Sequence, residues 1–599
     1  MTEGISARQM ESSVPTSQAL APLVIGVTGH RDLRDQDREP LERRVRSLLL
    51  ELKAKYPFTP LVLLSALAEG ADRLVARIAL EPSIEARLVA PLPMPRHCYE
   101  EDFPGSLEEF RALLEKAERS FELPLHEGNT EEGLRQPEQR AKQYQDVGEF
   151  IAGESQILVA LWDGAGAKTN PIGGTAQVVQ FQIEGVPSAE DCDLEPHECF
   201  PVYQILTPRM KNPNPMGEPF TLHKIYPKAF GKDESGAEEY YAEMLERLDE
   251  FNRNVAQANS ALIERVNASK TDIFAEVSEA GSQRITLERY AFADALAEAF
   301  QTRMIWTQKI LHWSVFLAFA CFVFYAHLPK LRHAEVSGHR PWWLCASTLF
   351  LLCGYYFYLT ARKRDLETNY QDYRAVAEGM RVKLFWELSG IAGRVTAYYL
   401  TKQRTELDWI CNVLRGWYCL DPKEAIDDDL AGGDSLDSNG IQLAVSRWVD
   451  AQREYFKEAA ERDRRKSELL EARVQLSLGA AALTAFVLTV ITFIAPLSKV
   501  IADNEWLHGL PLIVIELLLA AGALLHHYNE RMAFSQHAKQ YSRMRIVFEH
   551  ALVIVNDALE SKNYRRARTC LWNLGREALA ENGEWVLIHR ERPLELPHP

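Results

Sequence analysis

Two patterns of apolar and polar residues divide the chain. Between residues 22 and 208, short apolar runs alternate with segments in which apolar residues recur at helical spacing. From residue 310 onward, four nearly uncharged runs are each about as long as the roughly 20 residues that a helix needs to cross a bilayer. These runs are Ile310–Leu328, Trp342–Ala361, Val474–Leu497 and Trp506–Tyr528.

The first pattern predicts an α/β domain with five strands. The strands lie in "PLVIGVTGH", "PLVLLSALAEG", "ARLVAPLP", "FIAGESQILVALWDG" and "CFPVYQILTP". Helices are expected in "REPLERRVRSLLLELKAKYP", "GADRLVARIAL", "EEFRALLEKAERSF" and "GGTAQVVQFQIEG". Because the strands are apolar throughout rather than alternating, we expect a parallel sheet that helices cover on both faces.

The second pattern predicts an all-α membrane region with four transmembrane helices. Four buried helices of a large soluble protein are the alternative, but core helices usually carry a polar stripe and these runs do not. The short segments 329–341 and 498–505 join the runs into two hairpins. Lys and Arg residues crowd the outer ends of the hairpins, most clearly in 464–473 and 531–545. The positive-inside rule then places every soluble segment in the cytoplasm and the hairpins in the inner (cytoplasmic) membrane, as a multi-pass protein.

Six segments follow from these patterns. They are a polar, disordered tail (1–19), the α/β domain (20–208), a linker and helical insert (209–300), the first transmembrane hairpin (301–390), a cytoplasmic helical connector (391–473), and the second hairpin with C-terminal helices (474–599). A faint repeat links "NYQDYRAVAEGMRVKLFWEL" after the second run to "HAKQYSRMRIVFEHAL" after the fourth. If genuine, it means two copies of a helix–hairpin–helix unit.

Composition excludes several classes of function. The net charge of −17 argues against a nucleic-acid binder, because phosphate neutralisation needs clustered Lys and Arg. The nine Cys residues show no CxxC pair and no metal-ligand spacing, so we expect neither a disulfide framework nor a metal site. Residues 1–19 lack the apolar segment of a signal peptide.

Candidate binding residues cluster where the predicted strands end. Ligands of such sheets bind beyond the carboxyl ends of the strands. Glycines there let backbone N–H groups approach a phosphate at a helix N-terminus, and His30 and Arg31 add cationic donors. The candidates are Gly29, His30, Arg31, Ser65, Gly70, Asp72, Gly173, Gly174 and Thr175. Each also has a structural alternative: His30 bonds a loop carbonyl, Asp72 caps a helix or pairs with Arg73, and "GGT" is a tight turn with a Thr cap.

The ordered set "GVTGHRDL", "SALAEGADRLVA", "APLPMPRHCYEEDF", "SQILVALWDG" and "GGTAQVV" resembles the SLOG superfamily, a Rossmann-like nucleotide-sensing group, over residues 22–208. The segments "YRAVAEGMRVKLFWEL" and "LGREALAENGEWVLIHRERP" resemble SLATT two-transmembrane domains of bacterial conflict systems. The resemblance implies a nucleotide-derived ligand at the candidates above other than Ser65, and at Asp163. It also implies a ligand sensor with an oligomeric, membrane-disrupting output in antiviral defence.

Catalysis is not expected from this resemblance. Phosphoribohydrolases of the group carry GGxGTxxE, whereas "GGTAQVV" has Gln177 and no nearby Glu. We therefore expect no catalytic residue and no cofactor, although Glu69 and Asp72 are possible substitutes. The alternative is a membrane-anchored nucleotide or phosphoribosyl hydrolase. The expected partners are a nucleotide-derived molecule, the lipid bilayer and further copies of the chain, but no nucleic acid.

Glu516 lies inside the fourth apolar run. An ionisable residue at mid-helix costs about 2.5 kcal/mol or more on insertion scales, so it should face other helices or water. It is therefore a candidate for lining a pore or holding a subunit contact. In the alternative, the helix begins near Leu517 and Glu516 lies at the membrane interface.

Overall fold

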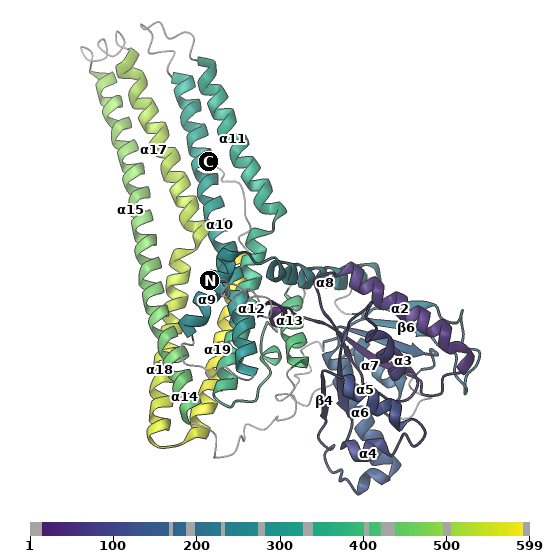
Figure 1. Ribbon diagram of the computed structural model, residues 1–599. Coiled ribbons are helices and arrows are strands. Elements are labelled where there is room, and N and C mark those ends of the chain that lie inside the picture. Colours follow the sequence, from purple (N-terminus) through teal and green to yellow (C-terminus); the bar gives the residue numbers. More distant parts are fainter. Residues whose placement is uncertain are drawn as a thin grey trace, which may run out of the picture.

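The computed structural model describes residues 15–166, 172–186, 198–228, 234–273, 282–327, 340–400, 407–420, 438–494 and 505–590. An α/β domain lies beside a body of helices, from which four long helices project in one direction (Figure 1). The predicted fold class is confirmed, because a mostly parallel sheet with helices comes first and an all-helical part with four long apolar helices follows.

One seven-stranded sheet forms the centre of the α/β domain, in the order β4-β3-β2-β1-β5-β6-β7. All neighbouring strands are parallel except β6 and β7. The strands are β1 Leu23–Gly29, β2 Leu61–Leu64, β3 Arg87–Leu92, β4 Arg119–Glu122, β5 Ile157–Trp162, β6 Val202–Leu206 and β7 Leu222–Ile225. The register pairs Gly29 with Leu161, so β1 and β5 end at the same level.

The two edge strands correct the sequence prediction. Arg119–Glu122 forms β4, although "EEFRALLEKAERSF" was expected to be helical to its end. Leu222–Ile225 forms β7 within the stretch assigned to a linker. Both strands are four residues long and partly exposed, so their pattern was too short to distinguish from a helix end or a loop.

Helices cover both faces of the sheet and create two cores. On one face lie α2 (Arg38–Lys55), α3 (Ala71–Ala79) and α5 (Leu107–Lys116). On the other face lie α6 (Pro137–Glu154) and α7 (Thr175–Glu184). The central strands are buried on both sides, which is why they read as continuous apolar runs.

The end of the expected disordered tail is ordered. Residues 15–19 form the short helix α1 (Pro15–Ala19), and Ala19 and Ala21 are fully buried. The side chain of Asn252 binds both the amide and the carbonyl of Ala21, at 2.8 Å each. Small apolar residues fit this tight packing. The prediction of disorder was therefore wrong for residues 15–19. Residues 1–14 lie outside the described part of the chain.

Two helix–hairpin–helix units form most of the helical part. The first is α10 (Ser282–His327), α11 (Arg340–Lys363) and α12 (Leu366–Leu388); the second is α15 (Ala451–Phe493), α17 (Glu505–Met532) and α18 (Phe534–Glu560). In each unit the long first helix packs against both helices that follow. A left-handed residue directly precedes the third helix of each unit, Asp365 (φ 44°) in the first and Ala533 (φ 50°) in the second. The faint sequence repeat therefore coincides with a structural one.

The remaining helices complete the helical body. They are α8 (Glu234–Ala256), α9 (Ser260–Ile273), α13 (Asp408–Cys419), α14 (Ser438–Ala444) and α19 (Tyr564–Arg590). A π-helical turn, Val445–Asp450, joins α14 to α15.

The four apolar helices stand in a single row. α15 packs against α17, α17 against α10, and α10 against α11 (Figure 1). The buried share of the most apolar stretch differs among the four helices. It is 28% in α10 and 22% in α17, but 17% in the span that contains α11 and 6% in the span that contains α15. The two end helices are thus the least covered. All four are long and apolar enough to cross a membrane, as the sequence predicted.

The helical body touches the amino-terminal edge of the sheet. Gly416 of α13 lies so close to the carbonyl of Pro22, just before β1, that an added Cβ would be 2.8 Å from its oxygen. Gln156, just before β5, donates to the carbonyl of Asn412 at 2.8 Å. Because the central strands are parallel, their carboxyl ends lie at the opposite edge, away from the helices.

Candidate functional site

The carboxyl-terminal edge of the sheet brings most of the predicted binding residues together. We call this region the rim: the loops after β1, β2 and β5 and the first turns of α3 and α7. The candidate residues at or beneath it are Gly29, His30, Arg31, Ser65, Gly70, Asp72, Asp163, Gly173, Gly174 and Thr175.

Two glycines hold the loop after β1 against the start of α3. A Cβ on Gly29 would lie 2.3 Å from the Cβ of Ala71. Gly70 has φ +82°, and its Cβ would lie 2.6 Å from the carbonyl oxygens of both His30 and Arg31. No side chain fits at either position, so the loop after β1 and the start of α3 pack closely against each other.

Two helices begin at the rim. α3 starts after Gly70 and α7 after Gly174. The first-turn amides of a helix have no intrahelical partner and carry partial positive charge, which favours an anion. At α3, however, the amide of Ala71 already donates to the carbonyl of His30 at 3.1 Å. At α7 the turn is closed internally, since the amide of Gly173 (φ +77°) donates to Oε1 of Gln177 at 2.7 Å. Gln177 thus has a structural role, because its side chain holds the turn that precedes α7.

Tyr144 of α6 joins the two helix starts. The guanidinium of Arg31, an exposed residue, lies 4.9 Å from the centre of the Tyr144 ring. A Cβ on Gly173 would lie 2.8 Å from the Cβ of Tyr144. The Tyr144 hydroxyl donates to Asp102. Arg31 is therefore held beside α7 with its donors accessible, as a ligand-binding cation should be.

His30 and Asp163 are engaged with the protein itself. Burial lowers the pKa of His30, which favours a neutral ring whose Nε2 accepts a hydrogen bond from the Asp163 amide at 3.1 Å. The Asp163 carboxylate accepts bonds from Arg209 at 2.9 Å and Asn212 at 3.1 Å. Burial alone would raise the pKa of Asp163, but the hydrogen bonds from Asn212 and from the Ala165 amide, and then the interaction with His30, lower it. His30 and Asp163 thus hold the loops after β1 and β5 in place, and few of their hydrogen-bonding atoms remain for a ligand.

Ser65 and Asp72 lie beneath the rim. Ser65 is fully buried and its hydroxyl accepts from the amide of Leu67 at 3.2 Å. Asp72 accepts from the amide of Ala68 at 3.4 Å. Burial raises the pKa of Asp72 to about 7, against the opposing effects of that bond and of the nearby arginines. Its protonation therefore changes near neutral pH.

Sequence reasoning missed Tyr144, Arg209 and Asn212. Tyr144 lies in α6, which the sequence did not predict, and the other two lie in the stretch assigned to a linker. No motif marks them; only the fold brings them to the rim.

Glu516 lies inside a continuous helix, α17, and beside a histidine of α10. α17 begins at Glu505, so the alternative in which the helix starts near Leu517 is wrong. Oε1 of Glu516 lies 3.1 Å from Nε2 of His327 in α10. This pair lies at the seam between the two hairpins, where partly buried polar groups replace lipid contacts.

One group of side chains has the composition of a metal site. Donor atoms of His97, Cys98 and Glu131 lie within 4.8 Å of one another, although their spacing gave no such signal. Burial raises the pKa of the Cys98 thiol, whereas a metal ligand must be the thiolate. Two of the three residues are also exposed, so the group does not fit a structural metal ion.

Comparisons of the chain with protein-family models, curated proteins and solved structures found no match.

Proposed function

We propose that this protein is a membrane sensor: a nucleotide-derived ligand binds at the rim, and the transmembrane hairpins respond. The observation that carries the proposal is the rim itself, where two helix starts, the close chain packing at Gly29 and Gly70, and the exposed Arg31 come together. Such an arrangement suits phosphate oxygens. The resemblance to SLOG and SLATT domains supports a role in bacterial defence.

Helix α6 supplies a physical link from the rim to the membrane part. Tyr144, in the middle of the helix, touches the rim. Glu154 ends the helix about 15 Å further along its axis, at 1.5 Å per residue, and forms an ion pair with Arg394 of the helical body. A ligand that shifts Tyr144 would move a rigid rod whose far end contacts the helices. The ligand must bind one arrangement better than the other for this to act as a signal.

The single row of apolar helices favours a membrane response that requires several copies of the protein to associate. A single row cannot enclose a channel, and its two end helices are poorly covered. Association of rows through these end helices would build either a pore or a disrupted patch of membrane. The excess of Lys and Arg near the body-side ends of the apolar helices supports a cytoplasmic location for the α/β domain under the positive-inside rule.

A hydrolase remains the second candidate because of Asp72. A carboxyl group with a pKa of about 7, close to the rim, suits proton transfer. In that case the hairpins are only an anchor.

Reconstituted full-length protein separates these functions. It would be incubated in dye-loaded liposomes with ADP-ribose and with cyclic nucleotides. Saturable binding with dye release and no product supports the sensor; turnover supports the hydrolase; neither binding nor turnover contradicts the rim assignment.

A matched pair of glycine variants locates the site. Gly70→Val should abolish binding, because even a Cβ meets two carbonyl oxygens. Gly105→Val should leave binding intact, because a Cβ there has no heavy atom within 4 Å. Equal binding by both variants would place the ligand elsewhere.

A further inference from the structure

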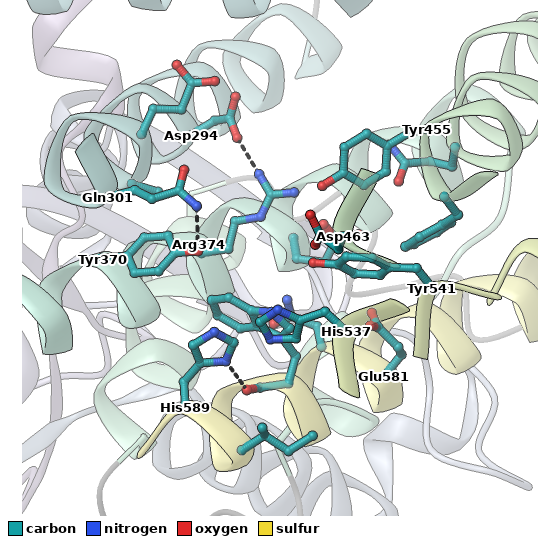
Figure 2. Close-up of a pocket in the computed structure, with 18 of the residues that line it drawn as sticks. Asp294, Gln301, Tyr370, Arg374, Tyr455, Asp463, His537, Tyr541, Glu581 and His589 are labelled. Atoms are coloured by element: carbon teal, nitrogen blue, oxygen red, sulfur yellow. Dashed lines mark hydrogen bonds and ion pairs between the residues drawn. The ribbon is translucent and has the colours of Figure 1, made fainter. Parts of the chain in front are cut away.

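A large cavity lies where the two helix–hairpin–helix units meet, just below the apolar helices. Its volume is about 540 Å³. We call it the juxtamembrane chamber; its walls come from α10 and α12 of the first unit, from α15, α17 and α18 of the second, and from α19 (Figure 2). It is separate from the rim, which lies at the far edge of the sheet.

Cationic side chains enter the chamber from both units. Arg374 and Arg381 come from α12, whereas Arg462 and Lys466 come from α15 and Arg531 from α17. Figure 2 shows Arg374 extending between Asp294 and the rings of Tyr455 and Tyr541. Because neither unit supplies the whole set, a guest held by these groups would tie the units together.

The acidic groups of the chamber are largely satisfied by these cations. The pairs are Asp294–Arg374 at 2.8 Å, Glu378–Arg381 at 2.8 Å, Glu367–Arg531 at 3.1 Å and Asp463–Lys466 at 3.7 Å. Glu581 differs, because burial, and then the neighbouring Glu378, raise its pKa to about 8. It is therefore mostly protonated at neutral pH. The six Lys and Arg side chains of the lining then face five ionised carboxylates, since Glu298 also lines the chamber, so the excess of positive charge is one.

Deep donors of the chamber are unused. Within the described residues, Nε of Arg381 and Nε1 of Trp448 have no hydrogen-bond partner, although these residues are 6% and 1% exposed. Both residues line the chamber. A buried donor without a partner is costly unless water or an ion meets it. Arg374 carries five N–H donors, of which one binds Asp294.

We propose that the juxtamembrane chamber binds a phosphate-type oxyanion that bridges the two helix–hairpin–helix units. Arg374 provides the central bidentate contact, and Lys466 adds charge from the second unit. Such a guest holds α12 and α15 at a fixed distance, so its presence sets how the two hairpins stand relative to each other.

The oxyanion has two possible sources. Met304, Ile305 and Gln308 of the lining lie immediately before the first apolar run. Ala533 and Phe534 follow directly on the fourth apolar helix. The chamber is thus within reach of the phosphate of an anionic lipid in the adjacent leaflet, as well as of free phosphate groups from solution.

Thermal unfolding of the full-length protein tests the proposal. One arm titrates inorganic phosphate against chloride at equal ionic strength in uncharged detergent. The other compares nanodiscs of phosphatidylcholine with nanodiscs that also contain phosphatidylglycerol. Stabilisation in the first arm identifies a soluble anion, and stabilisation in the second alone identifies a lipid headgroup. No stabilisation in either arm overturns the proposal.

Variants then assign the effect to the chamber. Arg374→Gln should weaken the stabilising ligand about tenfold or more, since a charge-assisted contact is lost. Arg464→Gln is the matched control, because Arg464 lies on the same helix as Lys466 but is 67% exposed and outside the lining. If Arg374→Gln does not fold, Lys466→Gln, at a half-exposed position, replaces it. Equal responses of the chamber variant and the control would refute the site.

Discussion

The buried carboxyl group of Asp72 makes a prediction about the pH dependence of the α/β domain. Its pKa is about 7 in the folded protein, against 3.8 ordinarily. A raised pKa means that the folded state holds the proton more tightly than the unfolded state does. The stability contributed by this group therefore falls as the pH rises from about 4 to about 7, and it is constant above that.

The magnitude follows from these two pKa values. Between about pH 5 and about pH 8.5, ionisation of Asp72 should lower the free energy of unfolding by about 3 kcal/mol. Asp72→Asn keeps the shape and the acceptor for the Ala68 amide but cannot ionise. The variant should therefore lack this decrease in the free energy of unfolding. Its stability relative to the native protein should be greater at about pH 8.5 than at about pH 5.

Hydrogen exchange of residues 61–80 in the full-length protein measures the effect. Dividing the exchange rate of the native protein by that of Asp72→Asn at the same pH cancels the intrinsic pH dependence of exchange. This ratio should rise about 100-fold between the two pH values. Asp35→Asn, at a side chain 95% exposed, is the control and should show no change. A constant ratio for Asp72→Asn would refute the argument that burial dominates its titration.

Three further predictions concern binding, coupling and the membrane seam. Gly70→Ala should weaken a rim ligand about tenfold or more in calorimetry, because its Cβ would lie 2.6 Å from two carbonyl oxygens; unchanged affinity would contradict the site. Arg394→Gln removes the partner of Glu154 at the base of α6, so ligand affinity should persist while dye release falls; equal loss of both would remove α6 as the link. Glu516→Gln breaks the pair with His327, so spin labels on α10 and α17 should report a wider or broader distance distribution; an unchanged distribution would show that the pair does not hold the seam.

The sequence predicted the elements whose pattern is long or strongly apolar. The five inner strands and the four apolar helices are confirmed, because burial on both faces or in lipid forces continuous apolar runs. It did not predict α6, whose sequence "PEQRAKQYQDVGEFIAGE" is rich in polar residues. Its apolar end, with Phe150 and Ile151, directly precedes β5, so the sequence pattern assigned it to the same segment as the strand that begins at Ile157.

The candidate site was predicted in outline but not in its contacts. Gly29, Gly70 and Gly173 meet other chain segments as the strand-end rule suggests. The partners of His30 and Asp163 could not be inferred, since Arg209 and Asn212 are distant in sequence and belong to no motif. The juxtamembrane chamber had no sequence signal either, because it arises only where two repeated units pack together.

The central claim is that occupancy of the rim changes the membrane helices. Dye release from liposomes carrying the full-length protein, measured while ADP-ribose or a cyclic nucleotide is titrated, tests it most directly. The account predicts release that saturates at one ligand per chain and disappears in Gly70→Val. Saturable binding at the rim with no change in release at any protein density would contradict it.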